Sequence, residues 1–363
     1  CTVGRAHSPK IFPASQYQGF KTCSATLIGC QSYRFPPRDK RLIFLNSSAI
    51  LAHAMRQIHH NWLIADIGAT SSRCAICCDG EITEIHAYRN QDQLGVAELL
   101  TAFMANVPEK PTACALAVAA PIDGDRVAMV NRNWGFDKAS IQALGLERVE
   151  ILNDFHAIAF ALPGFSDDTR IEIGRATQYR DGNIAVLGPG SGLGMAAWIS
   201  GQSAMCGEGG HISISGRDAH EDRIIAALRE RFDHASAERV LSGPGLMALH
   251  EAMHGDKPAS SEAITSAPEE KRNRETLDQF FLFLGSVAAE LALITGAYGG
   301  VYIAGGIVPA IVDVAQASGF RERFENKNRY RDYMRAIPTW IITDPYPGLT
   351  GLQAWITQGC RRP

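Results

Sequence analysis

Two adjacent polar residues, Asn153 and Asp154, are the pair in this sequence best suited to chemistry. The apolar run that ends at Leu152 predicts a buried strand, and the apolar run from His156 predicts a helix. The pair therefore follows the carboxyl end of a strand, where ligands bind in open α/β sheets. We expect Asp154 to take part in the chemistry. The alternative is that Asn153 or Asp154 only caps the helix that follows.

Two turns rich in glycine and hydroxyl residues each lie between two predicted strands. The first pattern is strand, turn and strand at 62–68, 69–72 and 73–78, and the second at 183–187, 188–194 and 195–199. The second turn has Leu193 or Met195 where a dinucleotide fingerprint needs its third glycine, and it lacks the lysine of a Walker A loop. Backbone N–H groups of such turns can converge on an anion. We therefore expect one phosphate-binding turn in each domain, the alternative being ordinary hairpin turns.

Two further glycine-containing segments carry candidate binding groups. Glu208 and His211 flank Gly209-Gly210, so they cannot share the helix of a zinc-binding HExxH motif. A loop of this kind suits recognition of hydroxyl groups, although a structural histidine is the alternative. The short strand before Gly305-Gly306 opens on a turn where a flat ring can lie against the backbone. A long apolar helix predicted over residues 275–295 reads as a buried core.

Composition and charge limit the class of protein. The chain has 363 residues, enough for two domains, and its 46% hydrophobic and 20% charged content is ordinary for a globular protein. Nine cysteines, an odd number, indicate a reducing compartment, and Cys74, Cys77 and Cys78 read as core residues. No apolar run reaches the length of a membrane span.

The charge is concentrated at the N-terminus. Residues 1–54 contain seven Lys or Arg and one Asp, a net charge of +6, which leaves −9 for the remainder of a chain whose total is −3. An acidic body provides no electrostatic footprint for nucleic acid. We interpret residues 1–54 as upstream sequence that the native protein lacks, with Met55 as its start. A transit segment is the alternative.

Six stretches resemble, in order and spacing, the bacterial ATP-dependent glucokinases: Asp66–Thr70, Asn153–Phe155, Gly190–Gly194, Gly207–His211, Ser236–Gly245 and Ile303–Pro309. The resemblance runs from about Met55 to the C-terminus and leaves out the basic leader, residues 1–54. It implies an α/β, two-domain actin-like or hexokinase-type (ribonuclease H-like) fold with an active-site cleft between the domains. The implied domains are a small one, residues 55–164 with 345–363, and a large one, residues 165–344.

The resemblance also implies roles for individual residues. Asp154 is similar to the general base that takes the proton of the sugar 6-hydroxyl, and a carboxylate of ordinary pKa suffices where proton transfer is late. The residues implied to bind the sugar are Asn153, Asp154, Glu208, His211 and Glu238. Those implied to bind ATP are Asp66, Gly68 and Thr70 in the first turn, Gly190, Ser191 and Gly192 in the second, and Gly305 and Gly306 beside adenosine. Asp66 would hold Mg²⁺ through water.

The resemblance implies a cytoplasmic homodimer that acts on glucose and ATP and binds neither nucleic acid nor membranes. The first turn departs from the family, because Gly68-Ala69-Thr70-Ser71 stands where Gly-Gly-Thr-Asn is usual. No zinc-binding cysteine cluster follows His211, so we expect no structural zinc. Two other functions stay open: a kinase of mannose, fructose or an amino sugar, and a non-catalytic, sugar-responsive regulator.

Overall fold

One sheet is built from the N-terminal part of the chain. The computed structural model describes residues 61–122, 124–129 and 134–359. Its first sheet has the order β3-β2-β1-β4-β7, in which β1, β2 and β3 are antiparallel and β4 and β7 run parallel to β1. The strands are β1 (Trp62–Ile67), β2 (Ser71–Cys78), β3 (Glu81–Arg89), β4 (Ala113–Val118) and β7 (Arg148–Asn153).

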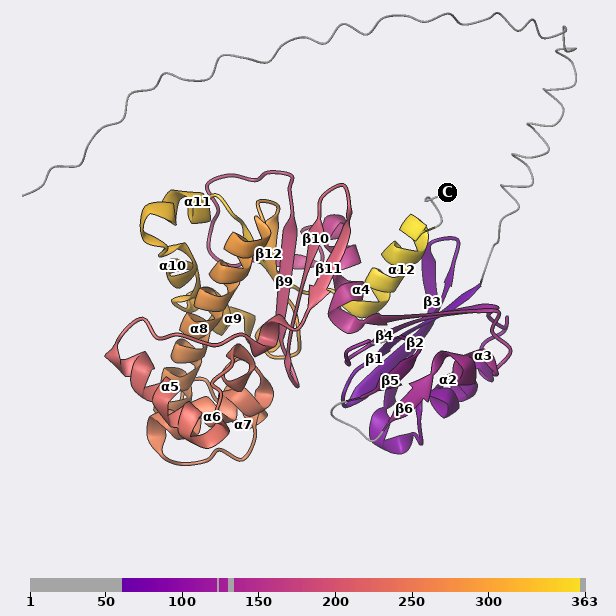
Figure 1. Ribbon diagram of the computed structural model, residues 1–363, viewed down its shortest axis with the longest axis horizontal. Helices are drawn as coiled ribbons and strands as arrows, with labels where there is room; N and C mark the ends of the chain where they lie inside the picture. The colour runs from indigo at the N-terminus through magenta and orange to yellow at the C-terminus, as the bar shows by residue number, and fades with distance from the viewer. Residues whose placement is uncertain (1–60, 123, 130–133, 360–363) are drawn as a thin grey trace, which may run out of the picture. The chain divides into compact units, whose positions relative to one another are not determined.

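Helices cover both faces of this sheet because alternate residues of β1 point to opposite sides. Leu63, Ala65 and Ile67 belong to a core that includes α2 (Val96–Met104) and α3 (Lys138–Gln142). Trp62 and Ile64 belong to a second core, with α4 (Asp154–Ala161) and α12 (Pro347–Gly359). Figure 1 shows α12 beside α4, although the two helices lie far apart in the sequence.

The second sheet repeats the strand arrangement of the first. Its order is β11-β10-β9-β12-β13-β8, with β9, β10 and β11 antiparallel and with β12 and β13 parallel to β9. An additional strand, β8, pairs antiparallel with β13 at the edge. The strands are β8 (Arg170–Glu172), β9 (Ile184–Pro189), β10 (Leu193–Ile199), β11 (Ser203–Gly207), β12 (Gly300–Ile303) and β13 (Thr339–Ile342). The β1–β2 and β9–β10 hairpins therefore occupy equivalent places in the two sheets.

The remaining elements are the helices that cover the second sheet, several short helices and 3-10 turns, and a separate pair of strands. The main helices are α5 (Ala219–Phe232), α6 (Gly243–His254) and α8 (Lys271–Thr295). Short helices are α7 (Ser261–Thr265), α9 (Val312–Ala317), α10 (Phe320–Glu325) and α11 (Arg331–Arg335). The 3-10 turns are η1 (Asn90–Asp92), η2 (Leu162–Gly164), η3 (Gly209–His211), η4 (Ala237–Arg239), η5 (Val308–Ile311) and η6 (Asn328–Tyr330). A separate pair of strands consists of β5 (Arg126–Ala128) and β6 (Gly135–Asp137).

Helix α4 packs against both sheets. Ala157 and Phe160 belong to the core of the first sheet. Phe155, Ile158 and Ala159 belong to a core with Val186 of β9, Ala196 of β10 and Tyr302 of β12. A helix that is apolar nearly all round is typical of a buried position. The strand and helix that carry Asn153 and Asp154 are thus held by contacts with both sheets.

Helix α8 is the core helix of the second sheet. Among the described residues it is the one helix long and apolar enough to cross a membrane, and 67% of its apolar window is buried within the protein. The sequence predicted this helix from residue 275, whereas it begins four residues earlier, at Lys271. Cys74 and Cys77 are buried free cysteines on β2, which confirms their interpretation as core residues.

One local expectation is corrected. The second glycine-rich turn is shorter than predicted, because Gly188 pairs with Gly194 within the strands and only residues 190–192 form the tip. Gly243-Pro244-Gly245 begins helix α6, since proline suits the first turn of a helix. The side chain of Ser260 caps helix α7. The interpretation of residues 1–54 lies outside the described residues.

Candidate active site

The neighbouring residues Asn153 and Asp154 have different structural roles. Asn153 is the last residue of β7 and the N-cap of α4, and its Oδ1 accepts hydrogen bonds from the backbone N–H groups of Phe155 and His156 at 3.0 and 3.1 Å. Asp154 is the first residue of the helix, and its Oδ1 accepts a hydrogen bond from Phe155 at 3.0 Å. Asn153 therefore fulfils the capping alternative, and α4 does not need Asp154 as its cap.

The carboxyl group of Asp154 lies in an acidic, half-buried environment. Burial raises its pKa to about 7, and the negative charges of Asp66 and Glu208 also raise it, while hydrogen bonds from backbone N–H groups lower it. Nothing in the local sequence reveals this environment, because Asp66 is far away from Asp154 along the chain. A carboxyl group with a pKa near neutrality is suited to exchange a proton at physiological pH.

The residue after Asp154 fixes the position of α4 against the β9–β10 hairpin. The ring of Phe155 fills the space left open by two facing glycines, Gly188 and Gly194. A Cβ atom on Gly194 would lie only 1.9 Å from Cδ2 of Phe155. These two glycines therefore serve packing, and only the tip between them remains available for a phosphate.

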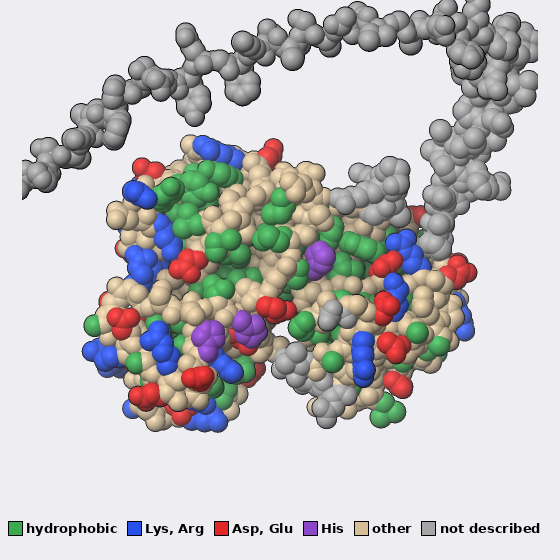
Figure 2. Space-filling model, viewed as in Figure 1, with side chains coloured by type: hydrophobic (Ala, Val, Ile, Leu, Met, Phe, Trp, Pro, Cys, Tyr) green, Lys and Arg blue, Asp and Glu red, His purple; other side chains and the backbone are tan. Residues whose placement is uncertain are grey.

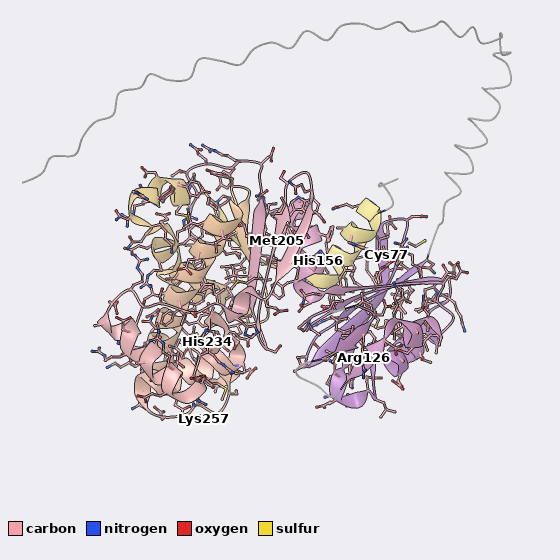
Figure 3. All side chains as sticks on the ribbon, viewed as in Figure 1. Cys77, Arg126, His156, Met205, His234 and Lys257 are labelled. Carbon is pink, nitrogen blue, oxygen red and sulfur yellow. The ribbon has the colours of Figure 1, made fainter. Side chains whose placement is uncertain are left out.

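Asn153 also connects three separate segments. Its Nδ2 donates to the carbonyl of Ala120 at 3.3 Å, and its Oδ1 accepts a hydrogen bond from the thiol of Cys206 on β11 at 3.2 Å. Figure 3 shows His156 of α4 beside the strand that carries Met205. Sequence reasoning missed Cys206, although its position two residues before Glu208 was a signal that it could lie at the site. Burial raises the pKa of this thiol to about 11, and the charges of Asp154 and Glu208 also raise it.

The turn η3 holds Glu208 and His211 beside β10. Gly210 packs so closely that a Cβ atom there would lie 2.2 Å from the carbonyl oxygen of Leu193. Glu208 interacts electrostatically with Asp154, whereas His211 lies three residues further along the turn with its side chain exposed. The two glycines are therefore required by close packing on β10, which fixes the backbone of the turn next to Glu208.

Glu238, in the 3-10 turn η4, also contacts strand β10. Its Oε2 accepts a hydrogen bond from the backbone N–H of Leu193 at 2.9 Å. The backbone N–H of Ala237 donates to the carbonyl of Ile212 at 2.9 Å, which ties η4 to the segment after η3. Leu193 thus contacts both the η3 turn and Glu238, so these candidate sugar-binding segments are brought together.

Asp66 is the partly exposed residue of β1, and it lies one residue before the end of this strand, beside the first hairpin turn. Its carboxylate is 18% exposed and lies 4.0 Å from Nη1 of Arg73, its partner in the β1–β2 register. Burial raises the pKa of Asp66, and the charge of Arg73 opposes that rise. Gly348, at the start of α12, packs so closely that a Cβ atom there would lie 2.8 Å from Cγ of Asp66. Gly68 follows half-buried and Thr70 lies exposed at the tip of this hairpin.

The tip of the second hairpin meets the Gly305-Gly306 turn and the start of α6. The carbonyl of Gly190 accepts a hydrogen bond from Gly243 N–H at 2.8 Å, and a Cβ atom on Gly190 would lie 4.0 Å from Gly306 N. Gly305 has a φ of +84°, which favours glycine. Ser191 is exposed at the tip, so the structure brings together the candidate phosphate and adenosine turns of the second sheet.

A magnesium ion fits the residues at the first turn. Mg²⁺ is bound in phosphoryl-transfer enzymes by one or two carboxylates together with water and substrate phosphates. Asp66 provides such a carboxylate, held beside the hairpin tip, and its electrostatic interaction with Asp154 indicates that the two carboxyl groups are close. Among the described residues, no group of three or more His, Cys, Asp or Glu side chains could hold a metal without the substrate.

Comparison with known proteins gives consistent matches over most of the chain. A family model described as Glucokinase matches residues 63–359. The chain is 41% identical to a glucokinase of Paramagnetospirillum magneticum over 313 residues, which is 81% of this chain and 97% of that protein. It is similar to the crystal structure of a glucokinase from an Antarctic psychrotroph, with a TM-score of 0.74 and 32% identity over 83% of this chain and 100% of that chain. A glucokinase of Balamuthia mandrillaris in complex with glucose has the same fold, with a TM-score of 0.69 and 17% identity over 88% of this chain and 100% of that chain.

Proposed function

This chain belongs to the glucokinase family, ATP-dependent hexose phosphotransferases, and on that premise we propose that Asp154 is the general base that activates the 6-hydroxyl of D-glucose. The observation that carries the proposal is the environment of Asp154. Its carboxyl group lies at the start of α4 beside Asp66 and Glu208, with a pKa of about 7. The acceptor hydroxyl loses its proton to this carboxylate as the phosphoryl group is transferred.

The sugar is oriented by the side chains around Asp154. We assign this role to Asn153, Glu208, His211 and Glu238. Glu208 interacts electrostatically with Asp154, and Glu238 is held on Leu193 of β10. Carboxylates, amides and imidazoles arranged on rigid turns can accept and donate the hydrogen bonds that distinguish sugar hydroxyls. Holding the hydroxyl at Asp154 provides the positioning on which phosphoryl transfer mainly depends.

The nucleotide is assigned to the two hairpin tips. We propose that the phosphates of ATP contact Gly68 and Thr70 in one tip and Gly190, Ser191 and Gly192 in the other, with adenosine against Gly305 and Gly306. Support comes from the contact of Gly190 with the Gly305-Gly306 turn. Asp66 would hold Mg²⁺, which neutralises phosphate charge when bound. The separate cores of the two sheets support a small domain of residues 55–164 and 345–363 and a large domain of residues 165–344.

We further propose that the enzyme is a cytoplasmic homodimer that binds neither nucleic acid nor membranes. On the face seen in Figure 2, basic and acidic side chains are interspersed. Such a face has no continuous basic surface of the kind that binds a phosphate backbone.

A coupled assay of hexose phosphorylation tests the choice of substrate. With ATP and magnesium, D-glucose is expected to have a higher kcat/KM than mannose, fructose and glucosamine, and ATP a higher kcat/KM than polyphosphate or ADP. Because a site built for a hydroxyl leaves its own polar groups unpaired when that hydroxyl is moved, discrimination should be well above tenfold. A higher kcat/KM for another hexose would identify the enzyme as a kinase of that sugar. No product with any sugar would favour the non-catalytic regulator.

Two glycines in the second tip allow the nucleotide and sugar assignments to be separated. A Cβ atom on Gly190 has no neighbour closer than 4.0 Å, whereas one on Gly192 would lie 2.6 Å from Oε2 of Glu238. We therefore expect Gly190→Val to crowd the phosphate and raise the KM for ATP while leaving the KM for glucose nearly unchanged. Gly192→Val should displace Glu238 and raise both KM values. Steady-state kinetics with each substrate varied checks this, and a rise in the KM for glucose alone with Gly190→Val would contradict the assignment.

A further inference from the structure

A buried asparagine outside the first hairpin is bonded to three residues of that hairpin. Asn90 follows β3 and is fully buried. Its Nδ2 donates to the carbonyl of Gly68 at 2.8 Å, and its Oδ1 accepts a hydrogen bond from Oγ of Ser72 at 2.7 Å. Its backbone N–H donates to the carbonyl of Thr70 at 3.0 Å. One residue therefore holds the beginning, the tip and the end of the turn.

The turn itself contains no amide side chain. Its residues are Gly68, Ala69, Thr70 and Ser71, and its own closing bond runs from Gly68 N–H to the carbonyl of Ser71 at 3.1 Å. The amide group that orients the backbone comes from Asn90, eighteen residues beyond its partner Ser72. The geometry of the tip is thus determined from outside the hairpin.

The hydrogen bond to Gly68 has a consequence for the next residue. In a planar trans peptide unit the C=O and the following N–H point in opposite directions. Because the carbonyl of Gly68 points toward Asn90 in the interior, the N–H of Ala69 points away from it. An N–H group fixed in that direction at a hairpin tip is available to an anion.

We propose that Asn90 is a positioning residue for the nucleotide: it orients the first hairpin tip so that its backbone can receive a phosphate of ATP. This inference rests on the proposed function of that tip. Asn90 need not touch the nucleotide, since it acts through Gly68, Thr70 and Ser72. Loss of the Asn90 side chain should therefore weaken binding of the nucleotide. Binding of the sugar should not change, because the sugar is assigned to other segments.

Two substitutions at position 90 test the proposal. Asn90→Asp keeps the shape but replaces the Nδ2 donor with an oxygen that repels the carbonyl of Gly68, and Asn90→Ala removes both side-chain bonds. Each is expected to raise the KM and the calorimetric Kd for ATP about tenfold or more, because a buried carbonyl loses its partner and the tip is no longer held. The KM for glucose should change less than twofold. Ser72→Ala keeps Asn90 in place and should give a smaller change of the same kind, even if the position 90 variants fold poorly.

Asn273 provides a matched control. It is also buried, and its Nδ2 donates to two backbone carbonyls, those of Ala263 and Ala267. Asn273 lies in α8, one of the helices that cover the second sheet. Asn273→Ala should lower the melting temperature without changing the KM for ATP. If Asn90→Asp and Ser72→Ala lower only the melting temperature, as Asn273→Ala does, the inference is overturned.

A substitution at the tip separates the inference from the function on which it rests. Thr70→Val changes an exposed side chain at the proposed phosphate contact. A raised KM for ATP with Thr70→Val but not with the Asn90 variants overturns the role of Asn90 alone. An unchanged KM for ATP with all of these variants overturns the phosphate assignment of the tip as well. A raised KM for ATP with Thr70→Val and the Asn90 variants supports both.

Discussion

Asp154→Asn is expected to lower kcat by roughly 10²- to 10⁴-fold, because an amide cannot accept the proton of the sugar hydroxyl. The helix should remain intact, since Asn153 and not Asp154 is the N-cap of α4. Glucose should still bind, because Asn153, Glu208, His211 and Glu238 are unchanged. The measurement is kcat together with glucose binding by calorimetry on the same preparation. A variant that keeps most of its kcat would exclude Asp154 as the base.

The raised pKa of Asp154 adds a pH signature to the same experiment. The wild-type kcat/KM should fall as the pH drops below about 7, because the carboxyl group becomes protonated. Stability depends on pH in the opposite direction from activity, because it falls as the pH rises. A folded-state pKa above the usual aspartate value of 3.8 means that the charged form is disfavoured in the fold, so stability is lost as pH rises toward about 7. Asp154→Asn should therefore melt at a higher temperature than wild type at pH 8, with a smaller difference at pH 5.

Asp167→Asn is the control for both measurements. The side chain of Asp167 is 90% exposed, in an ion pair with Arg170, and lies on the segment before β8. Its removal should leave kcat, the pH profile and the melting temperature almost unchanged, since exposed ion pairs contribute little to stability. An equal fall of kcat in both variants would show that the loss at position 154 is not specific.

Asp66→Asn is expected to lower kcat by about 10²- to 10³-fold, the range seen when a group that stabilises transition-state charge is removed. It should also weaken the dependence on magnesium, because the carboxylate proposed to hold the ion is lost. A second effect distinguishes it from a general loss of folding. The negative charge of Asp66 raises the pKa of Asp154, so without that charge the pKa of Asp154 falls. The acidic limb of the kcat/KM profile should therefore move to lower pH.

The two effects of Asp66→Asn are measured by a magnesium titration and by pH profiles of kcat/KM for glucose. Arg73 lies 4.0 Å from Asp66, and its positive charge lowers the pKa of that carboxyl group. An acidic limb that moves to higher pH in Asp66→Asn would contradict the electrostatic link between the two carboxyl groups. An unchanged magnesium requirement would contradict the assignment of Asp66 to the ion.

The sequence by itself determined the elements and the kind of chemistry. The apolar strands on either side of the glycine-rich turns predicted both hairpins, since alternation and turn residues act between near neighbours in the chain. The six matching stretches indicated the glucokinase family and its fold class, both of which are confirmed. The roles of the individual site residues stay predictions, which the substitutions above test.

Only the tertiary structure decided how these residues are used. It made Asn153 the cap, placed Asp66 and Glu208 around Asp154 to raise its pKa, and used Gly188 and Gly194 to receive Phe155. It also brought Cys206 to Asn153 and Asn90 to the first hairpin. Apart from the Asn153 cap, each of these features is a contact between residues distant in the sequence. Burial, electrostatic shifts and close packing depend on the distances between such residues, and those distances are set only when the sheets and α4 pack together.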